Sequence, residues 1–217
     1  MIDATSSVSA LLQPAADARG CYVMAHGAGA GMAHPFMNAI AEGLAERGIT
    51  TLRYQFPYME RGSKRPDPPA VAHAAVRAAV AEATRRAPDL PLFAGGKSFG
   101  GRMTSQAQAA APLPGVRGLV FFGFPLHPAG RPSDERAAHL DAVHVPLLFL
   151  QGTRDELAER ALVAAVAGRL GTRATLAFID ATDHAFHVPA RSGRNDTAVR
   201  TELLERCVEW MDAVSAR

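Results

Sequence analysis

Short apolar runs alternate with longer, alanine-rich amphipathic segments along most of the chain. The runs are rich in β-branched and aromatic residues, as strands are, whereas the longer segments repeat their apolar residues at helical spacing. The pattern predicts strands at 20–25, 49–56, 91–95, 116–124, 146–151 and 174–179, and a weaker one near 8–12. It predicts helices at about 35–47, 69–86, 99–110, 156–170 and 197–216.

The order of these elements predicts the fold class. Runs such as PLLFLQ at 146–151 are apolar throughout, which is typical of strands buried on both faces. Regular strand–helix alternation then predicts an α/β protein with a mostly parallel sheet of about six to seven strands and helices on both faces. No repeat or long linker interrupts the pattern, so we expect one domain over residues 1–217. The connection 125–145 has room for one helix, near 133–143, and is too short for a cap domain.

Composition and charge narrow the classes of function. The 217 residues are 48% hydrophobic and 20% charged, which is ordinary for a globular protein, and the net charge is only +2. No basic block stands out, so nucleic acid is not an expected partner. Cys21 and Cys207 lie far apart and fit no metal spacing, and we expect neither a metal nor a cofactor. The absence of a long apolar stretch and of a signal-peptide pattern indicates a cytoplasmic protein without a membrane partner.

One stretch, FAGGKSFGGRM at residues 93–103, gathers four glycines around Ser98 and follows a predicted strand. Two interpretations compete, because GGKS is typical of the end of a phosphate-binding loop and GKSFG fits the G-x-S-x-G nucleophile elbow. The phosphate-binding loop needs a glycine where Pro91 stands, so that interpretation fails. A second glycine cluster, at 27–32, fails the dinucleotide-binding pattern because Met32 stands at the position of its last glycine.

The elbow interpretation meets the requirements of its context. Ser98 lies between a predicted strand and a predicted helix, and a tight turn there forces the serine into a strained backbone conformation. Gly96 and Gly100 omit side chains that would collide at such a turn, and Gly101 lets the helix approach the sheet closely. The turn presents the serine oxygen beyond the sheet, beside the free N–H groups of a helix N-terminus.

A nucleophilic serine needs a general base, and the base needs a group that orients it. Asp155 follows the predicted strand 146–151 and His184 follows the strand 174–179, so both are expected at the same sheet edge as Ser98. Their order along the chain, serine then acid then histidine, is the one expected for this kind of elbow. An imidazole with an ordinary pKa of about 6.5 can accept a hydroxyl proton at neutral pH. We therefore predict a catalytic triad of Ser98, His184 and Asp155.

Other residues compete for the base and the acid. His187 lies three residues beyond His184 and is the rival base, but the DHAF context favours His184. Asp180 and Asp183 are the rival acids. Both share a strand end or a turn with His184, whereas Asp155 follows a separate strand and fits the expected arrangement better.

Lys97, directly before Ser98, raises the question of a Ser–Lys pair. Neighbouring side chains diverge at an elbow, which disfavours Lys97 as the base. We expect its stem to pack against other residues while its ammonium reaches a carboxylate.

The negative charge that develops during acyl transfer needs two N–H donors. One is the backbone of Phe99, directly after Ser98. The second is expected from the loop HGAGAG at 26–31, where small residues let the backbone approach a substrate. Ala28 is the first choice and Gly29 the second. One such donor stabilises a transition state by about 3 kcal/mol.

The motifs HGAGAGM, GGKSFGG, QGTRDEL and DHAF, in this order, resemble those of the α/β-hydrolase superfamily over nearly the whole chain. The resemblance is closest to small dienelactone-hydrolase-like members. More narrowly, FPYMERG at 56–62 and GGKSFGGRM at 95–103 resemble an uncharacterised bacterial group related to a domain of a eukaryotic histone-acetyltransferase complex subunit. The resemblance implies the α/β-hydrolase fold and a hydrolase triad. Ser98 departs from the cysteine nucleophile of dienelactone hydrolases proper, which argues against lactone substrates.

Two loops at the predicted sheet edge, 57–69 and 125–132, are expected to form the walls of an open site without a lid. Their basic residues fit either a solvated surface or recognition of an anionic acyl or leaving group. The candidate substrate contacts are His26, Tyr58, Arg61, His127 and Arg131. Of these, His26 fits a structural hydrogen-bonding role better than contact with a substrate.

These residues predict a carboxylesterase-like serine hydrolase that cleaves a small ester, thioester or related acyl bond through an acyl-enzyme. The expected partner is a small-molecule acyl substrate. The alternative is a catalytically silent binding or scaffold module with the same fold. The sequence does not indicate the acyl group, the leaving group or the oligomeric state.

Overall fold

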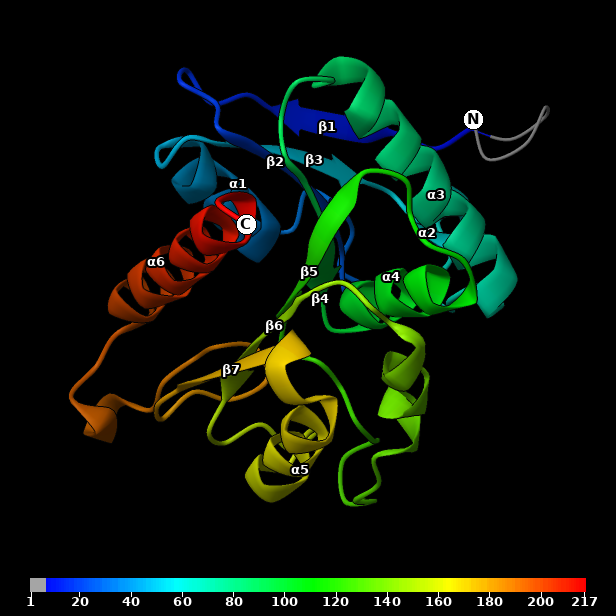
Figure 1. Cartoon of the computed structure of the whole chain (residues 1–217). Coiled ribbons are helices and arrows are strands. Elements are labelled where there is room, and N and C mark those ends of the chain that lie inside the picture. Colours follow the sequence, from blue (N-terminus) through cyan, green and yellow to red (C-terminus); the bar gives the residue numbers. More distant parts are fainter. Residues whose placement is uncertain (1–6) are drawn as a thin grey trace.

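A computed structural model of the chain describes residues 7–217 and shows one seven-stranded sheet (Figure 1). The strands are β1 (Ala10–Gln13), β2 (Gly20–Ala25), β3 (Ile49–Tyr54), β4 (Leu92–Lys97), β5 (Val116–Phe122), β6 (Leu147–Gly152) and β7 (Ala174–Ile179). They lie in the order β1-β3-β2-β4-β5-β6-β7. Strand β1 is antiparallel to β3, and every other neighbouring pair is parallel, which confirms the predicted sheet. Residues 1–6 of the expected single domain lie outside the described part.

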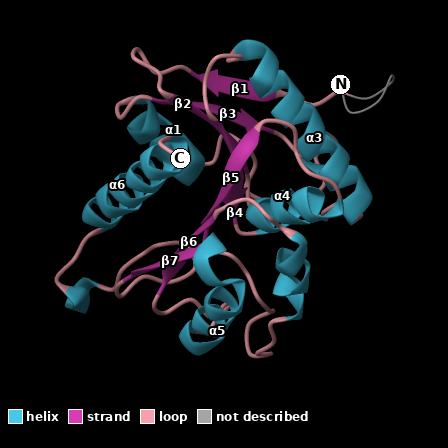
Figure 2. Ribbon diagram, in the orientation of Figure 1, coloured by secondary structure: helices cyan, strands magenta, loops and turns pink. Residues whose placement is uncertain are grey.

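Helices cover both faces of this sheet (Figure 2). They are α1 (Pro35–Ala45), α2 (Pro57–Glu60), α3 (Pro69–Arg86), α4 (Phe99–Ala110), α5 (Arg160–Leu170) and α6 (Asp196–Ser215). Helices α1 and α6 pack on one face, whereas α3, α4 and α5 pack on the other. Within residues 7–217, no helix is both long enough and apolar enough to cross a membrane.

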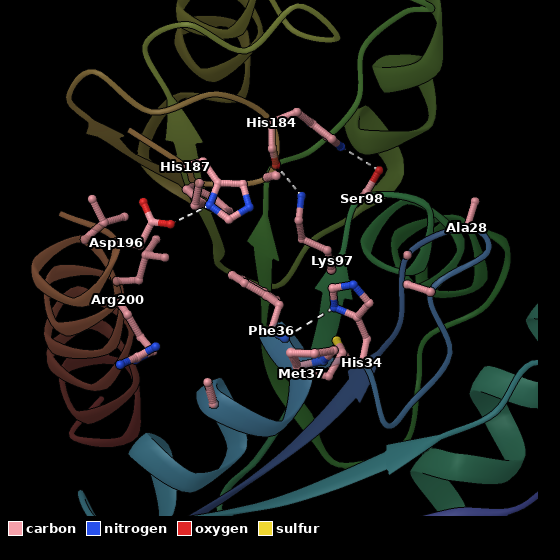
Figure 3. Close-up of a pocket in the computed structure, with 18 of the residues that line it drawn as sticks. Ala28, His34, Phe36, Met37, Lys97, Ser98, His184, His187, Asp196 and Arg200 are labelled. Atoms are coloured by element: carbon pink, nitrogen blue, oxygen red, sulfur yellow. Dashed lines mark hydrogen bonds and ion pairs between the residues drawn. The ribbon is translucent and has the colours of Figure 1, made fainter. Parts of the chain in front are cut away.

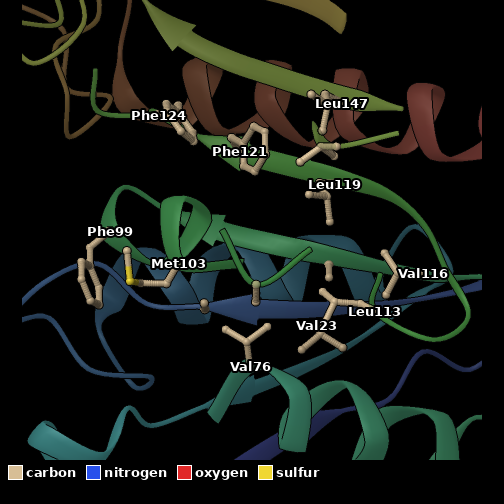
Figure 4. Packing of buried hydrophobic residues seen from close by; sticks show 14 of the residues in the cluster. Val23, Val76, Phe99, Met103, Leu113, Val116, Leu119, Phe121, Phe124 and Leu147 are labelled. Carbon is tan, nitrogen blue, oxygen red and sulfur yellow. The ribbon is translucent and has the colours of Figure 1, made fainter. Parts of the chain in front are cut away.

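Strand β2 shows why these runs form a sheet that is buried on both sides. Cys21, Val23 and Ala25 point into the core under α3 and α4, and Tyr22 and Met24 point into the core under α1 and α6. Alternate side chains of a strand face opposite sides of its sheet, so a continuous apolar run fills two cores at once. Figure 4 shows the first core, where strand residues meet the helices that cover them: Val23, Val76, Met103, Leu119, Phe121 and Leu147.

The structure differs from the predicted elements at their ends and in one loop. Strand β4 continues to Lys97 because residues 95–97 still pair with β5. Helix α5 begins at Arg160 instead of 156, because residues 155–159 form a turn before it. The predicted loop 57–69 begins with the short helix α2. The connection between β5 and β6 holds a 3₁₀ helix, Glu135–Ala142, and within residues 7–217 no cap domain covers the sheet edge.

Candidate active site

The turn that joins β4 to α4 places Ser98 at the carboxyl-terminal edge of the sheet. Ser98 has φ 50° and ψ −116°, so it is one of the few non-glycine residues of the described chain with a positive φ. Such a conformation costs about 1–3 kcal/mol and persists only where the surroundings impose it. Here the ladder of β4 ends directly before the serine and α4 begins directly after it.

Two glycines allow this turn to pack against β2. A Cβ atom on Gly96, whose φ is +147°, would lie 2.1 Å from the Ala25 carbonyl oxygen. A Cβ atom on Gly100 would lie 2.5 Å from the same oxygen. Both distances are far below van der Waals contact, and the obstacle is backbone rather than a movable side chain. The first turn of α4 therefore touches the sheet only because these positions carry no side chain.

His184 and Asp155 reach Ser98 from the loops that follow β7 and β6. His184 Nε2 lies 2.8 Å from Ser98 Oγ, and His184 Nδ1 lies 2.7 Å from Asp155 Oδ2. Asp155 is 4% exposed, so a proton on Nδ1 faces a buried carboxylate. In this arrangement Nε2 is left with its lone pair toward the serine hydroxyl, which can donate to it. The three residues predicted from sequence are thus brought together in one hydrogen-bonded line.

Backbone hydrogen bonds tie the Asp155 and His184 loops to each other. Thr153 N–H donates to the Ile179 carbonyl at 3.1 Å, and Arg154 N–H donates to the Thr182 carbonyl at 2.9 Å. These bonds continue the pairing of β6 and β7 into the turns beyond the strand ends. The separation of Asp155 and His184 is therefore fixed by the backbone as well as by their own contact.

Gln151, the second-last residue of β6, donates a hydrogen bond to the Asp155 carboxylate. Its Nε2 donates to Asp155 Oδ2 at 2.5 Å, and its Oε1 accepts from Phe124 N–H at 2.9 Å. The other carboxylate oxygen, Oδ1, accepts from Leu157 N–H at 2.8 Å. Asp155 thus receives hydrogen bonds on both oxygens, which fix the orientation of its carboxylate. Gln151 was not predicted from the sequence, although it is a polar residue at the end of the apolar run PLLFLQ.

Lys97 contacts the loop that carries His184 rather than a carboxylate. Its Nζ donates to the His184 carbonyl oxygen at 2.6 Å and lies 5.2 Å from the centre of the Phe186 ring (Figure 3). The expectation of a carboxylate partner is therefore wrong. Burial lowers the pKa of Lys97 from its ordinary 10.5 to about 8, against the opposing effect of the Asp155 and Asp183 charges.

The rival base and acids have other partners. His187 Nδ1 pairs with Asp196 Oδ2 at 2.6 Å on the exposed side of the site, away from Ser98 in Figure 3. Asp183 Oδ1 accepts two backbone N–H groups of its own turn, and Asp180 accepts a hydrogen bond from Thr153 at 3.3 Å. These contacts favour His184 and Asp155 over their rivals.

The loop after β2 and the start of α4 each bring a candidate backbone donor, Ala28 and Phe99, to the cavities at Ser98. Gly29 N–H donates to the Tyr58 hydroxyl at 3.2 Å, so this amide already has an acceptor. Within residues 7–217, the N–H groups of Ala28 and Phe99 have no recorded acceptor. Ala28 and Phe99 are therefore available to bind an oxyanion, which favours Ala28 over Gly29 as the second donor.

Three candidate substrate contacts are buried. His26 is 0% exposed, and both of its ring nitrogens are bonded, Nδ1 to the Gly27 carbonyl and Nε2 to the Phe56 N–H. Tyr58 is 1% exposed and holds Gly29. His127 is also 1% exposed, and its Nδ1 bonds to the Pro128 carbonyl. These side chains support the loops of the site and do not reach its surface. His26 thus has the structural role that the sequence favoured, whereas burial argues against substrate contact for Tyr58 and His127.

The two arginines among the candidate contacts do not face Ser98 either. Arg61 is exposed and ion-paired with Asp67 at 2.5 Å. Arg131 is exposed, and neither arginine lines the cavities that meet at the serine. Sequence composition identified basic loops correctly but not the direction of their side chains.

An apolar cavity of about 670 Å³ opens on the His184 side of Ser98 (Figure 3). Its lining combines the loop after β2, the start of α1, the His184 loop and α6. Apolar side chains dominate it: Phe36, Met37, Leu157, Phe186, Val199 and Leu203. A cavity of this size and character suits a small apolar group. Within residues 7–217, no three His, Cys, Asp or Glu side chains lie together as metal ligands.

The model of the alpha/beta hydrolase domain family matches residues 18–212, which is most of the chain. The chain belongs to this family. In this α/β-hydrolase, Ser98, Asp155 and His184 lie beyond the carboxyl ends of parallel strands. Open α/β sheets bind their ligands at this edge.

Solved structures of the same fold agree with this assignment. A dienelactone hydrolase from Anabaena variabilis has a TM-score of 0.75 at 20% identity, with 97% of this chain and 93% of that chain covered. An alpha-beta serine hydrolase homologue from Coxiella burnetii has a TM-score of 0.73 at 18% identity, with 92% and 91% covered. A serine hydrolase without a lid from Xanthomonas campestris has a TM-score of 0.71 at 22% identity, with 94% and 89% covered. At these identities the likeness shows the fold alone, and the narrower relation to a histone-acetyltransferase complex subunit stays a prediction.

Proposed function

We propose that the chain is a serine hydrolase that cleaves a small ester, thioester or related acyl bond through an acyl-enzyme on Ser98. One observation carries the proposal: the strained Ser98 at the strand end shares a hydrogen bond of 2.8 Å with His184, which is held by buried Asp155. A serine, a base and an orienting acid in this order of contact are the parts that nucleophilic acyl transfer needs.

The first half of the reaction forms the acyl-enzyme. Ser98 Oγ attacks the acyl carbon while His184 Nε2 accepts its proton, and Asp155 stabilises the imidazolium that results. The bond to the leaving group then breaks, and the leaving group takes the proton from Nε2. In the second half, water attacks the acyl carbon and gives its proton to His184. Collapse of that intermediate returns the proton to Ser98 and frees the acid.

The oxyanion of each tetrahedral intermediate would lie between the N–H groups of Ala28 and Phe99. Both amides lack a recorded acceptor within residues 7–217, so the site does not have to break an existing bond to use them. The partial positive charge at the start of α4 acts on the same atom. Donors that are oriented before the reaction stabilise the transition state without reorganisation, and one is worth about 3 kcal/mol.

The decisive experiment compares wild type with Ser98→Ala, using p-nitrophenyl acetate and a fluorophosphonate probe that labels activated serines. His184→Ala tests the base, and His187→Ala is its matched control because it removes a histidine from the same loop. We expect Ser98→Ala and His184→Ala to lower kcat by at least about a thousandfold, since each triad member is needed for the others to act. His187→Ala should keep wild-type turnover within a few-fold, and the probe should label wild type only at Ser98.

Two results would contradict the proposal. Full turnover or labelling in Ser98→Ala would show that another residue is the nucleophile. Folded wild-type protein that is neither labelled nor active with any ester of the panel would favour the alternative of a silent binding or scaffold module. An ester panel of increasing acyl chain length, run in parallel, identifies the size of the acyl group.

A further inference from the structure

A second cavity, of about 430 Å³, lies next to Ser98 and has a different chemical character. It shares Ala28, Ser98 and Leu157 with the apolar cavity, so the two cavities meet at the serine. Its other walls come from α4, from the 3₁₀ helix 135–142 and from the end of the loop 61–69. Two cavities that meet at a nucleophile can hold the two parts of a substrate on either side of the bond that is cut.

Arg102 brings an unpaired positive charge into this second cavity. It stands in the first turns of α4, where its N–H donates to the Ser98 carbonyl at 3.1 Å. Its side chain is half-buried, and within residues 7–217 its guanidinium has no ion pair. The Nε atom is fully buried without a hydrogen-bond partner. The one favourable contact recorded for the charge is the Phe99 ring, 5.9 Å from the guanidinium carbon.

The nearest charged neighbour of Arg102, Arg136, adds positive charge to the cavity. Arg136 lines the same cavity and, like Arg102, has no ion pair among the described residues. Burial lowers the pKa of Arg102, and the charge of Arg136 lowers it further. His139 lies close enough to be affected as well: burial, and to a lesser extent the charge of Arg102, lower its pKa to about 4. One acid, Asp67, also lines the cavity: its Oδ1 pairs with Arg61, and its Oδ2 is buried without a hydrogen-bond partner.

A half-buried cation without a partner costs free energy, because it loses water and gains no opposite charge. Such a charge is expected where a ligand supplies the missing anion, and an arginine can bind a carboxylate with two parallel hydrogen bonds. Among the described residues, the apolar cavity has no comparable pair of arginines, since its lining includes one arginine, Arg200, together with Asp196.

We propose that the second cavity is an anion subsite, in which Arg102 and Arg136 bind a carboxylate carried by one half of an ester substrate. The uncharged half then occupies the apolar cavity. The inference rests on the proposed hydrolase function and narrows it to esters with a free carboxylate. It assigns anion recognition to Arg102 and Arg136 rather than to the exposed loop arginines.

A kinetic experiment uses two matched ester pairs. The first pair, mono-4-nitrophenyl adipate and 4-nitrophenyl hexanoate, differs by a carboxylate on the acyl group. The second pair, 4-(carboxymethyl)phenyl hexanoate and its methyl ester, differs by a carboxylate on the leaving group. For at least one pair, the ratio of kcat/KM for the acid over the neutral ester should fall about tenfold or more in Arg102→Met and in Arg136→Met. The pair that responds shows which half of the substrate the subsite holds.

Arg117→Met is the matched control, because Arg117 is an exposed arginine at the opposite end of β5 and its loss changes the net charge equally. Its acid-to-neutral ratios should equal those of wild type. Arg102→Met should fold, since methionine keeps the length of the stem and removes an unpaired charge. Ratios that are the same in wild type, Arg102→Met and Arg136→Met for both pairs overturn the anion subsite and leave the hydrolase function standing.

A binding experiment decides the subsite even without turnover. At least one of adipate and 4-hydroxyphenylacetate should raise the melting temperature of Ser98→Ala, compared with sodium chloride at equal ionic strength. They should fail to do so in the double variant Ser98→Ala/Arg102→Met. Equal stabilisation of both proteins, or of neither, contradicts the subsite. Stabilisation that depends on Arg102, in a protein with no Ser98-dependent turnover, refutes the hydrolase function and supports the subsite.

Discussion

The ammonium of Lys97 holds the backbone carbonyl of His184 at 2.6 Å, so the residue directly before the serine anchors the loop of the base. The contact spans 87 residues of sequence and joins the end of β4 to the loop after β7. The Phe186 and Phe36 rings close around the ammonium, at 5.2 and 6.0 Å from their centres. If His184 is the base, as we propose, we expect Lys97 to position its imidazole through the backbone that carries it.

Lys97→Met should lower kcat about tenfold while KM stays close to wild type. The variant keeps the apolar stem but loses a charge-assisted hydrogen bond, which is worth about 1.5–3 kcal/mol when made. The His184 loop can then shift, and a small displacement of a base lowers the rate more than it lowers substrate binding. Steady-state kinetics with p-nitrophenyl acetate separate the two constants.

Lys64→Met is the control for this prediction, since Lys64 is the other lysine of the chain and is exposed. It should leave both constants unchanged. A Lys97→Met protein with wild-type kcat would show that the hydrogen bond to His184 does not position the base.

The same lysine predicts a pH dependence of stability. In the folded protein burial lowers the pKa of Lys97 to about 8, whereas the unfolded chain restores the ordinary 10.5. Between these values the unfolded state binds more protons, so stability rises with pH. Above about pH 10.5 Lys97 is neutral in both states, so its burial costs no stability through charge. As the pH falls from there to about 8, this advantage is lost, because the unfolded state gains a proton first.

Melting temperatures of wild type and Lys97→Met, measured from pH 7 to pH 10.5, test this sign. The melting temperature of wild type should rise relative to that of Lys97→Met as the pH rises through this range. The other titrations are common to both proteins and cancel in the difference. A constant difference across the range contradicts the lowered pKa.

The sequence predicted Ser98, Asp155 and His184 because each follows a strand, and parallel strands bring their carboxyl ends to one edge. A strand end determines where the backbone of the next residue lies, but not where its side chain points. His26 stands at the same edge, yet its ring turns inward to meet the Phe56 N–H. Tyr58 likewise faces the core, because the predicted loop begins with a helix that buries it.

Residues that act through tertiary contacts left weaker signals. Lys97 was expected to meet a carboxylate, and only the packing of Phe186 and the His184 loop directs it to a carbonyl. Arg102 reads as an ordinary polar residue of an amphipathic helix. Among residues 7–217 it has no ion-pair partner, because the 3₁₀ helix 135–142 places Arg136 and not an acid beside it.

Gln151→Met should lower both stability and kcat. The side chain is fully buried, and its loss leaves the Phe124 N–H without an acceptor and Asp155 without one donor. An unsatisfied buried group costs about 1–3 kcal/mol. The carboxylate, held by fewer bonds, orients the imidazole less well, so kcat should fall about tenfold.

Gln108→Met separates the two effects of that change. Gln108 is also buried, and its Oε1 accepts from the Leu113 N–H at 2.8 Å, at the far end of α4. We expect a similar loss of stability with unchanged kcat. Denaturant titration and kinetics of both variants form the test. Equal kcat values in the two proteins would show that Gln151 does not contribute to turnover through Asp155.

Gly100→Ala should destabilise the protein and abolish most of its activity. The added Cβ would lie 2.5 Å from the Ala25 carbonyl oxygen, so the first turn of α4 must move away from β2. Overpacking of this kind costs about 1–3 kcal/mol, which exceeds the gain in helix propensity of about 1 kcal/mol. The movement displaces Ser98 and the Phe99 N–H together, so kcat should fall more than tenfold.

Gly168→Ala is the matched control, because Gly168 lies inside helix α5 and a Cβ there meets nothing within 4 Å. Here the propensity gain acts alone, and stability should rise by about 0.5–1 kcal/mol with unchanged kcat. If the elbow is as tight as the Ala25 contact indicates, denaturant unfolding should show a loss of stability in Gly100→Ala and a gain in Gly168→Ala. Turnover of p-nitrophenyl acetate should fall in Gly100→Ala alone. A Gly100→Ala protein that gains stability like Gly168→Ala would show that α4 can move away from β2 without cost, and that the glycine is not what fixes the serine.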